Sequence, residues 1–336
     1  MTAMREGQLS NLAIRPQARA AVEEIIEEAF KYQAPYKFRE DFYPLLAPGN
    51  AAHNHLILQG DTVIGHLGVR LVNLVWATCK IPVALVGGLA IQKAWRGQGL
   101  FKAAFNQVLQ LYEKQVGLFI LWSDQAALYA KFNFWQAGLV LQLGEKTNLI
   151  PALIRAGWRK YTPYDFRDPL GQQLPALYQR YAKNFLAVER TAADWQTLAG
   201  IKSATYLVHP TSASLIDAYV VIGKGFDLGG VVHEVGGDEA GLAEFLSHWQ
   251  NYKIWLPGTK KWQQQFPLAK PLYTGLFRRG NEAWLKPLWA KLDQETQQSI
   301  TQLYQAGEDH LLWPKLFGPG ENPLLPPLFI SGLDSI

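Results

Sequence analysis

The spacing of apolar residues changes twice within the first 72 positions of the chain. Over residues 18–32, apolar side chains recur at helical spacing with glutamates between them, which predicts an amphipathic helix. Two runs rich in apolar strand formers follow, at residues 55–59 and 62–72, and Gly60-Asp61 separates them. This pattern predicts an antiparallel hairpin.

A third apolar run, over residues 83–91, is interrupted by Gly87 and Gly88. Paired glycines inside a strand indicate a bulge, or a place where another group approaches the backbone closely. The rest of this half is predicted from its periodicity as a helix, a strand, a short helix and a strand, at residues 101–112, 118–121, 126–132 and 139–143.

The second half of the chain repeats this order of elements without clear sequence identity. Residues 151–169 carry charges, prolines and aromatic residues, and we expect them to connect the two halves. Beyond them, helices and strands are predicted at residues 175–185, 192–198, 205–209, 216–222, 231–235, 239–251 and 254–256. We therefore predict an α/β (α+β) fold of two mixed-sheet units in tandem, with helices on both faces of the sheets.

The C-terminal part differs from both units. Residues 282–306 offer two helical segments, and residues 314–336 combine prolines and glycines with many large apolar residues. Because a disordered tail rarely carries so many of these, we expect it to pack on the body of the protein. The predicted domains are residues 1–150, 151–280 and 281–336.

The composition excludes several classes of protein. Of 336 residues, 49% are hydrophobic and 18% are charged, which argues against a disordered chain. The net charge of +4 is mild and the basic residues are scattered, so no nucleic-acid partner is expected. The single cysteine, Cys79, allows neither an intrachain disulfide nor a zinc site of cysteines, and we expect it to be buried. The sequence shows no signal-peptide pattern and no apolar run of about 18 residues, so we expect a cytoplasmic location and no membrane partner.

The segment Arg96-Gly97-Gln98-Gly99 lies between a predicted strand and a predicted helix. A helix N-terminus presents unpaired N–H groups and a positive dipole end, and glycines let the backbone approach a ligand. A phosphate is the natural partner, with Arg96 and Lys102 adding positive charge. The alternative is an ordinary surface turn before a helix. The segment is neither a dinucleotide fingerprint nor a P-loop.

With its flanking elements, the segment Arg96-Gly97-Gln98-Gly99-Leu100-Phe101 resembles the acetyl-CoA motif of the GNAT superfamily of N-acetyltransferases. That motif reads Arg or Gln, two residues, Gly, one residue, then Gly or Ala. Phe101 stands at the last small position. The departure implies that the helix begins slightly differently against the pantetheine arm.

Residues 123–134 resemble a later GNAT segment, whose core is Leu-Tyr-x-Lys-x-Gly-Phe. Leu128, Tyr129 and Lys131 match it, and Asn133 replaces the glycine. After Gly, Asn best tolerates the left-handed conformation that ends such a helix. The two segments lie in the expected order with a predicted strand between them.

The resemblance implies roles for individual residues. The strand before the glycine loop would splay open at residues 88–91, and the N–H near Leu89 would polarise the thioester carbonyl. Tyr129 would be the general acid, a phenol of pKa near 10 that donates to the departing thiolate. A structural tyrosine that closes the short helix is the alternative. The implied coenzyme-binding residues are Leu89, Ala90, Ile91, Arg96, Gly97, Gln98, Gly99, Leu100, Phe101 and Ser123.

The general base is not visible in the sequence. The candidates Glu40, Asp41, His53, His55 and His66 are each more typical of ordinary surface or core positions. The enhanced-intracellular-survival type acetyltransferases have tandem GNAT folds, a Ser before the Tyr motif and a C-terminal carboxylate as base. By that resemblance, the apolar tail would bring the carboxylate of the last residue, Ile336, to the site, which we keep as a hypothesis.

The second unit lacks an equivalent glycine loop. Gly236-Gly237-Asp238-Glu239 follows its central strand, and two carboxylates would repel phosphates. We therefore predict one coenzyme site per chain, and a degenerate second unit that shapes the acceptor pocket or an interface. Its tryptophans are expected in the core: Trp195, Trp249, Trp255 and Trp262.

The predicted function is that of an N-acetyltransferase, which moves the acetyl group of acetyl-CoA to a primary amine by direct attack on the thioester and without a metal. The acceptor is expected to be a small-molecule or peptide amine, and a homodimer is left open. Two alternatives remain. One is acyl or aminoacyl transfer with another donor or acceptor, and the other is a non-catalytic acyl-CoA-binding protein.

Overall fold

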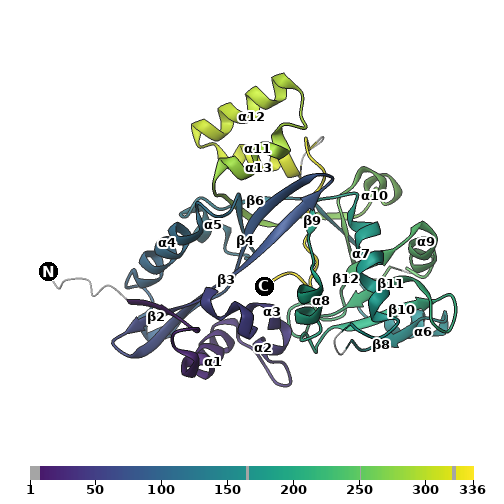
Figure 1. The fold of residues 1–336 in the computed structure, drawn as a ribbon, viewed down its shortest axis with the longest axis horizontal. Coiled ribbons are helices and arrows are strands. Elements are labelled where there is room, and N and C mark those ends of the chain that lie inside the picture. The colour runs from purple at the N-terminus through teal and green to yellow at the C-terminus, as the bar shows by residue number, and fades with distance from the viewer. Residues whose placement is uncertain (1–7, 164–165, 250, 320–322) are drawn as a thin grey trace.

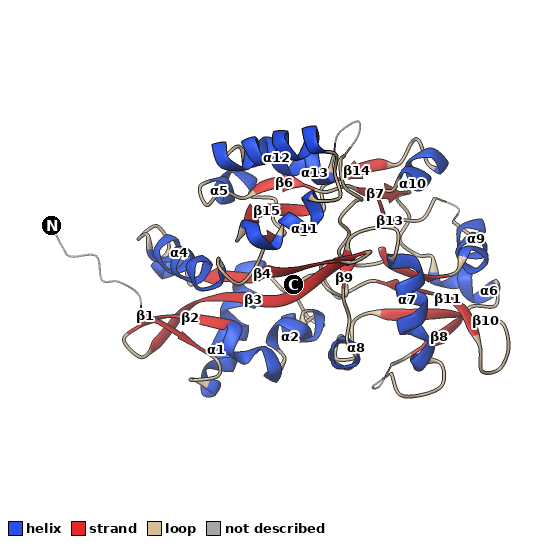
Figure 2. Ribbon diagram, turned by 45° about the horizontal axis from the view of Figure 1, so that its top comes forward, coloured by secondary structure: helices blue, strands red, loops and turns tan. Residues whose placement is uncertain are grey.

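The computed structural model describes residues 8–163, 166–249, 251–319 and 323–336. The chain forms two units, each built on its own β-sheet, and a group of C-terminal helices lies above the first of them (Figure 1). The last residues of the chain run between the two units, as both ribbon views show (Figure 2).

The N-terminal part of the chain supplies most of the first unit. Its elements are β1 (Gln8–Asn11), α1 (Arg19–Phe30), α2 (Phe38–Asp41), α3 (Tyr43–Leu46), β2 (Asn54–Gln59), β3 (Thr62–Trp76), β4 (Cys79–Ile91), α4 (Leu100–Tyr112), β5 (Leu118–Leu121), α5 (Ala126–Ala130) and β6 (Trp135–Ala137). The helices and strands predicted here are confirmed, with shifts of a few residues at their ends.

The remaining elements are β7 (Val140–Leu143), α6 (Ile150–Arg155), β8 (Arg159–Tyr161), α7 (Leu174–Ala182), β9 (Ala187–Val188), α8 (Ala192–Leu198), β10 (Thr205–Pro210), β11 (Ile216–Ile222), β12 (Val232–Gly237), α9 (Glu239–Ser247), β13 (Ile254–Pro257), α10 (Lys260–Gln265), β14 (Lys270–Leu272), β15 (Gly275–Arg279), α11 (Lys286–Trp289), α12 (Gln294–Ala306) and α13 (Asp309–Phe317). The helices and strands predicted for the rest of the chain occur in the predicted order, together with others that were not predicted, among them β9, α10, β14, β15 and α13. The segment 151–169 was expected only to connect the units, yet it contains α6 and β8. The sequence Arg159-Lys160-Tyr161 gives no apolar alternation, so the pairing of β8 with β10 could not be predicted.

The two sheets exchange their last strands. The strand order is β1-β2-β3-β4-β5-β15-β6 in the first sheet, with β9 beside β3, and β14-β7-β13-β12-β11-β10-β8 in the second. Thus β7 leaves the N-terminal half to lie between β14 and β13, and β15 returns to lie between β5 and β6. The domain boundaries near residues 150 and 280 stay a prediction for the sequence units, since the sheets interlock across them.

The first sheet is covered on both faces, as predicted. Along β5, Leu118 and Ile120 belong to one hydrophobic core, and Phe119 and Leu121 belong to another. Because alternate residues of a strand point to opposite faces, these cores lie on opposite sides of the sheet. The first core includes residues of α1 and of the C-terminal helices, and the second includes the apolar face of α4.

The C-terminal tail packs on the body of the protein, which confirms that expectation. Leu325, Leu328 and Ile330 are buried in the core of the first unit. The main chain of Leu186 donates to Pro327 O at 3.0 Å and accepts from Phe329 N at 3.0 Å, so the tail is also fixed between the units.

Candidate functional site

Strand β4 loses one neighbour before it ends. Its parallel pairing with β5 stops at Val86 and Leu121, whereas its pairing with β3 continues to Ile91. Residues 87–91 therefore border an opening on the β5 side. The register with β3 shifts in this stretch, and Gly88 has φ +59°, which confirms the predicted bulge.

A cavity of about 350 Å³ occupies this opening. Its walls are the end of β4, the glycine loop, the first turns of α4 and α5, and one residue of α1. The lining residues are Ala29, Leu89, Ala90, Ile91, Trp95, Arg96, Gly97, Gly99, Leu100, Phe101, Gln125, Leu128 and Tyr129. The structure thus brings together two segments that the sequence places about 30 residues apart.

Two of the predicted coenzyme-binding residues do not line this cavity. The Gln98 side chain donates to Ala94 O at 3.2 Å, and the Ser123 hydroxyl accepts from the main-chain N–H of Gln125 at 3.0 Å. Both side chains are engaged in local turn structure, so their binding role stays a prediction.

Four residues line the cavity but were not predicted to bind the coenzyme, and only some of them could have been found from the sequence. Trp95, Gln125 and Leu128 adjoin predicted residues along the chain, so a wider window around each motif would have found them. Ala29 lies on the apolar face of α1, where nothing in the sequence separates it from an ordinary core position.

The glycine loop presents its main chain to solvent. Gly97 and Gly99 have φ +77° and +78°, both residues are exposed, and the N–H groups of residues 97–99 have no hydrogen-bond partner in the described part of the chain. Helix α4 begins at Leu100 with no acidic residue in its first turn. The guanidinium Nε of Arg96 donates to Ile91 O at 3.0 Å, which holds this cation beside the loop. The loop therefore offers amides, a helix dipole and one positive charge to an anion.

Phe101, which replaces the small residue of the motif, is held against its own helix. Its ring stacks on Phe105 with centroids 5.4 Å apart and meets Phe132 edge-on at 6.1 Å. It therefore adds an apolar wall to the cavity.

Tyr129 lies in the wall opposite the loop and is 8% exposed. Burial, together with the charge of Asp124, raises the pKa of its phenol to about 12, so the group stays protonated at neutral pH. A thiol has a pKa of about 8.5, so full proton transfer from this phenol to a thiolate would be uphill by about 5 kcal/mol. The role of Tyr129 as the general acid stays a prediction, and the high pKa of its phenol favours donation of a hydrogen bond to the sulfur.

Asn133 ends helix α5 in the left-handed conformation that the motif requires, with φ +61°. The main-chain N–H of Phe134 then donates back to Tyr129 O at 3.1 Å. This confirms that Asn133 takes the structural place of the motif glycine.

Of the histidine candidates for the general base, His55 and His66 are buried in the first unit and His53 is half-buried. His53 and His55 each lie 2.8 Å from the hydroxyl of Tyr112, and burial lowers the pKa of both, that of His55 to about 4. His66 lies 2.7 Å from Gly88 O, and burial lowers its pKa to about 4 as well. With pKa values of about 4, His55 and His66 are neutral at pH 7. None of the three histidines lines the cavity.

The two carboxylate candidates also lie away from the cavity lining. Asp41 is buried, and its Oδ2 accepts from the main-chain N–H of Phe226 at 3.1 Å, so it joins α2 to the second unit. Glu40 is half-buried in the same helix.

Ile336 lies against the bulged part of β4. A Cβ atom at Gly87 would lie 2.6 Å from the carbonyl carbon of Ile336, so only glycine permits this approach. Paired glycines here were predicted to mark such a contact. The catalytic role expected for the Ile336 carboxylate stays a prediction.

Two arginines fix the tail in this position. Arg190 donates to Asp334 from Nη2 at 2.7 Å and from Nε at 3.0 Å, and Arg70 donates to Asp334 O at 3.1 Å. Arg190 also forms a two-point contact with Glu234, at 2.9 and 2.5 Å. The tail is thus bonded to strand β3 of the first unit and to strand β12 of the second.

A buried lysine holds the last turn of the tail. Lys224 Nζ donates to Gly332 O at 2.7 Å and to Ser335 O at 2.9 Å, and it lies 3.9 Å from the centre of the Phe42 ring. Burial lowers the pKa of this ammonium from 10.5 to about 7.

We expect this lysine to make stability depend on pH. Because its folded-state pKa lies below its unfolded value, the unfolded chain binds more protons between pH 7 and pH 9, and the free energy of unfolding rises with pH there. Lys224→Met removes this contribution, so urea unfolding at pH 7 and pH 9 should show a smaller rise for the variant. Equal rises in both proteins would contradict the assignment.

Among the described residues, no group of three or more His, Cys, Asp or Glu side chains is placed to hold a metal ion. In the same residues, no helix combines the length and the apolar character needed to cross a bilayer.

The part of the chain that forms most of the cavity matches a known protein family. Residues 19–134 match the family model of the acetyltransferase (GNAT) family. No curated protein matches the sequence.

Solved structures with a similar fold come from several organisms. A probable N-acyltransferase from Enterococcus faecalis V583 superimposes with a TM-score of 0.58 at 15% identity, covering 81% of this chain and 72% of that one. A GCN5-related N-acetyltransferase from Kribbella flavida gives 0.56 at 15% identity, covering 81% and 71%. The N-myristoyltransferase of Saccharomyces cerevisiae, solved with bound myristoyl-CoA, gives 0.52 at 10% identity, covering 82% and 80%. These similarities confirm the predicted tandem fold. The resemblance to the enhanced-intracellular-survival subgroup stays a prediction.

Proposed function

We propose that this chain is an acyltransferase that moves the acetyl group of acetyl-CoA to a primary amine. The match of residues 19–134 to the family model of the acetyltransferase (GNAT) family supports this proposal. The observation that carries this proposal is the cavity between the separated strands β4 and β5. It joins an exposed loop of free amides to a buried, protonated tyrosine.

The glycine loop would bind the diphosphate of the coenzyme. The N–H groups of residues 97–99 and the N-terminus of α4 supply donors and a positive dipole, and Arg96 supplies the charge. The unpaired side of residues 87–91 would bind the amides of the pantetheine arm.

The reaction then needs a nucleophile, a polarised carbonyl and a stabilised leaving group. The amine nitrogen attacks the thioester carbon, and the main-chain N–H near Leu89 stabilises the negative charge that develops on oxygen. A C–N bond forms, the C–S bond breaks, and the surplus proton of the amine passes to water. Tyr129 donates a hydrogen bond to the sulfur as it leaves as a thiolate.

A longer acyl chain is a second candidate for the donor. Trp95, Phe101 and Leu128 give the cavity an apolar wall, and the similarly folded N-myristoyltransferase was solved with a long-chain acyl-CoA. The acceptor is then the same class of amine.

A release assay for free CoA thiol tests the proposal. Acetyl-CoA and myristoyl-CoA are each offered with a panel of small-molecule and peptide amines. We expect amine-dependent release with at least one pair and strong loss in Arg96→Glu, but not in Arg155→Glu, which reverses an exposed charge on α6. Release that no amine stimulates, with either donor, would contradict the proposal.

A further inference from the structure

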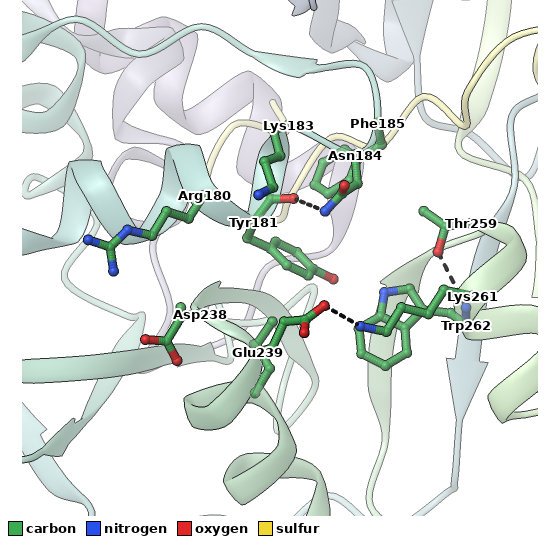
Figure 3. Close-up of a pocket in the computed structure, with 12 residues that line it drawn as sticks. Arg180, Tyr181, Lys183, Asn184, Phe185, Asp238, Glu239, Thr259, Lys261 and Trp262 are labelled. Atoms are coloured by element: carbon green, nitrogen blue, oxygen red, sulfur yellow. Dashed lines mark hydrogen bonds and ion pairs between the residues drawn. The ribbon is translucent and has the colours of Figure 1, made fainter.

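The second unit contains a larger cavity, of about 480 Å³, that the proposed reaction does not use (Figure 3). It lies among the C-terminal end of α7, the end of β12, and the first turns of α9 and α10. Nothing in the sequence analysis pointed to it, because the second half lacks a glycine loop.

This cavity is the counterpart of the one in the first unit. There, the cavity opens where the parallel strands β4 and β5 separate; here, the parallel strands β12 and β13 pair only at Val232 and Ile254. The surrounding elements also correspond, with α7, α9 and α10 in the places of α1, α4 and α5. The duplicated fold has therefore kept a second opening at the same position of its sheet.

The chemistry of this second opening does not suit a diphosphate. Asp238 caps α9, and its Oδ1 accepts from the main-chain N–H of Gly241 at 3.0 Å, so a carboxylate already occupies the helix N-terminus. Glu239 follows directly. A ligand of another class has to be considered.

Three donors line the cavity at or just after the C-terminal end of α7: Arg180, Tyr181 and Lys183. The side chain of Tyr181 is 6% exposed and lines the cavity, and its hydroxyl proton has no acceptor in the part of the chain that the structure describes. The indole N–H of Trp262 interacts with this hydroxyl only as a donor to its oxygen. Burial raises the pKa of this phenol, so its proton is retained and lacks an acceptor. A buried donor without a partner is costly, and a ligand that accepts from it recovers that cost.

Positive charge on this side of the cavity is not neutralised. Arg180 and Lys183 line the cavity, are exposed, and form no ion pair with another described residue. Across the mouth, by contrast, Glu239 is paired with Lys261 at 3.1 Å, as the dashed line in Figure 3 shows. The free charge therefore favours an anionic group beside Tyr181.

The rest of the lining is apolar. Phe185 is 2% exposed and Trp262 is 6% exposed, and Leu242 of α9 completes this wall. The predicted core position of Trp262 is confirmed, and one surface of it also borders the cavity. Aromatic and aliphatic side chains of this kind bind the body of a small ligand, while a few polar groups fix its orientation.

We propose that this cavity binds a small carboxylic acid with an aromatic or aliphatic body. The carboxylate accepts the hydrogen bond of Tyr181 and lies near Lys183, and the body of the acid packs on Trp262. The two cavities share no lining residue, so the proposed ligand is a different molecule from the coenzyme of the proposed function.

Isothermal titration calorimetry of the full chain with two matched probes tests this inference. The probes are 3-phenylpropionate and phenethylamine, which share a phenyl body and differ in the sign of their charge. We expect one 3-phenylpropionate per chain. Phenethylamine, which is also an amine of the acceptor class, should not displace the acid. Tyr181→Phe should weaken the binding of the acid at least tenfold, because a hydrogen bond to a charged group is lost. Tyr273→Phe, at an exposed position outside the cavity, is the matched control.

Several outcomes of these titrations would contradict the proposed acid site. Displacement of the acid by phenethylamine, no binding of the acid, or acid binding unchanged in both Tyr181→Phe and Lys183→Met would overturn the inference. Displacement of the acid by CoA would also overturn it. Arg96→Glu, which disables the coenzyme site in the proposed function, should leave the titration unchanged, so failure of one proposal is distinguishable from failure of the other.

Discussion

Tyr129→Phe is expected to lower the turnover number of acyl transfer about 10²- to 10³-fold, the usual cost of removing one donor to a charge that develops in the transition state. The phenol is buried and protonated in the wall of the cavity, and the substitution removes only its hydroxyl. The ring still packs against Phe105 and Phe134, so the cavity keeps its shape. Steady-state rates with a saturating acyl-CoA give the measurement.

Coenzyme affinity separates this role from a structural one. The dissociation constant for CoA should change less than threefold in Tyr129→Phe, because the glycine loop is untouched. Tyr252→Phe, in the second unit, is the control for the removal of a tyrosine hydroxyl elsewhere. If Tyr129→Phe kept the turnover number of the parent protein, the catalytic role would be contradicted. Tyr129 would then have only the structural role of closing helix α5.

Arg190→Met should lower the apparent free energy of unfolding by about 3–5 kcal/mol, since it leaves two buried carboxylates without their cation. Glu234 and Asp334 are both buried and both bond to this guanidinium. Burial alone would raise the pKa of Glu234. The guanidinium of Arg190 instead holds this pKa below its usual value, so the cation stabilises the buried carboxylate. Chemical denaturation at pH 7 measures the loss.

An exposed arginine is the comparison for this effect. Arg155→Met, on the surface of α6, should stay within about 0.5 kcal/mol of the parent protein. A loss below 1 kcal/mol in Arg190→Met would mean that water or a shift of the tail replaces the arginine.

Local structure was the part of the fold most open to prediction. Helix α1 and strand β5 follow from apolar spacing alone, and the glycine pair Gly87-Gly88 indicates the bulge in β4 from the sequence. Such features depend on residues close together in the chain, whose conformational preferences act in the same direction.

The exchange of strands between the sheets could not be predicted. The residues of β7 are apolar whichever sheet they join, and those of β15 are no more informative. Register with a partner more than 100 residues away is decided by packing, which leaves no periodic mark on either strand.

The residues of the candidate site also fall into two groups, those that a local motif predicts and those that only the structure shows. The loop at Arg96 and the segment at Tyr129 were found because each is a compact motif, and the structure places them around one cavity. The ion pairs of Arg190 and the buried Lys224 were missed, because in a sequence these residues look like ordinary surface charges. The second cavity was missed for a related reason, since its lining residues are distributed over several elements.

The central claim is that the exposed amides of residues 97–99, assisted by Arg96, bind the diphosphate of CoA. Calorimetric titration of the folded chain with CoA measures this directly. The account predicts binding of one CoA per chain, strongly weakened in Arg96→Glu. A well-folded protein that takes up no CoA, or an Arg96→Glu variant that binds it as tightly as the parent, would contradict the account.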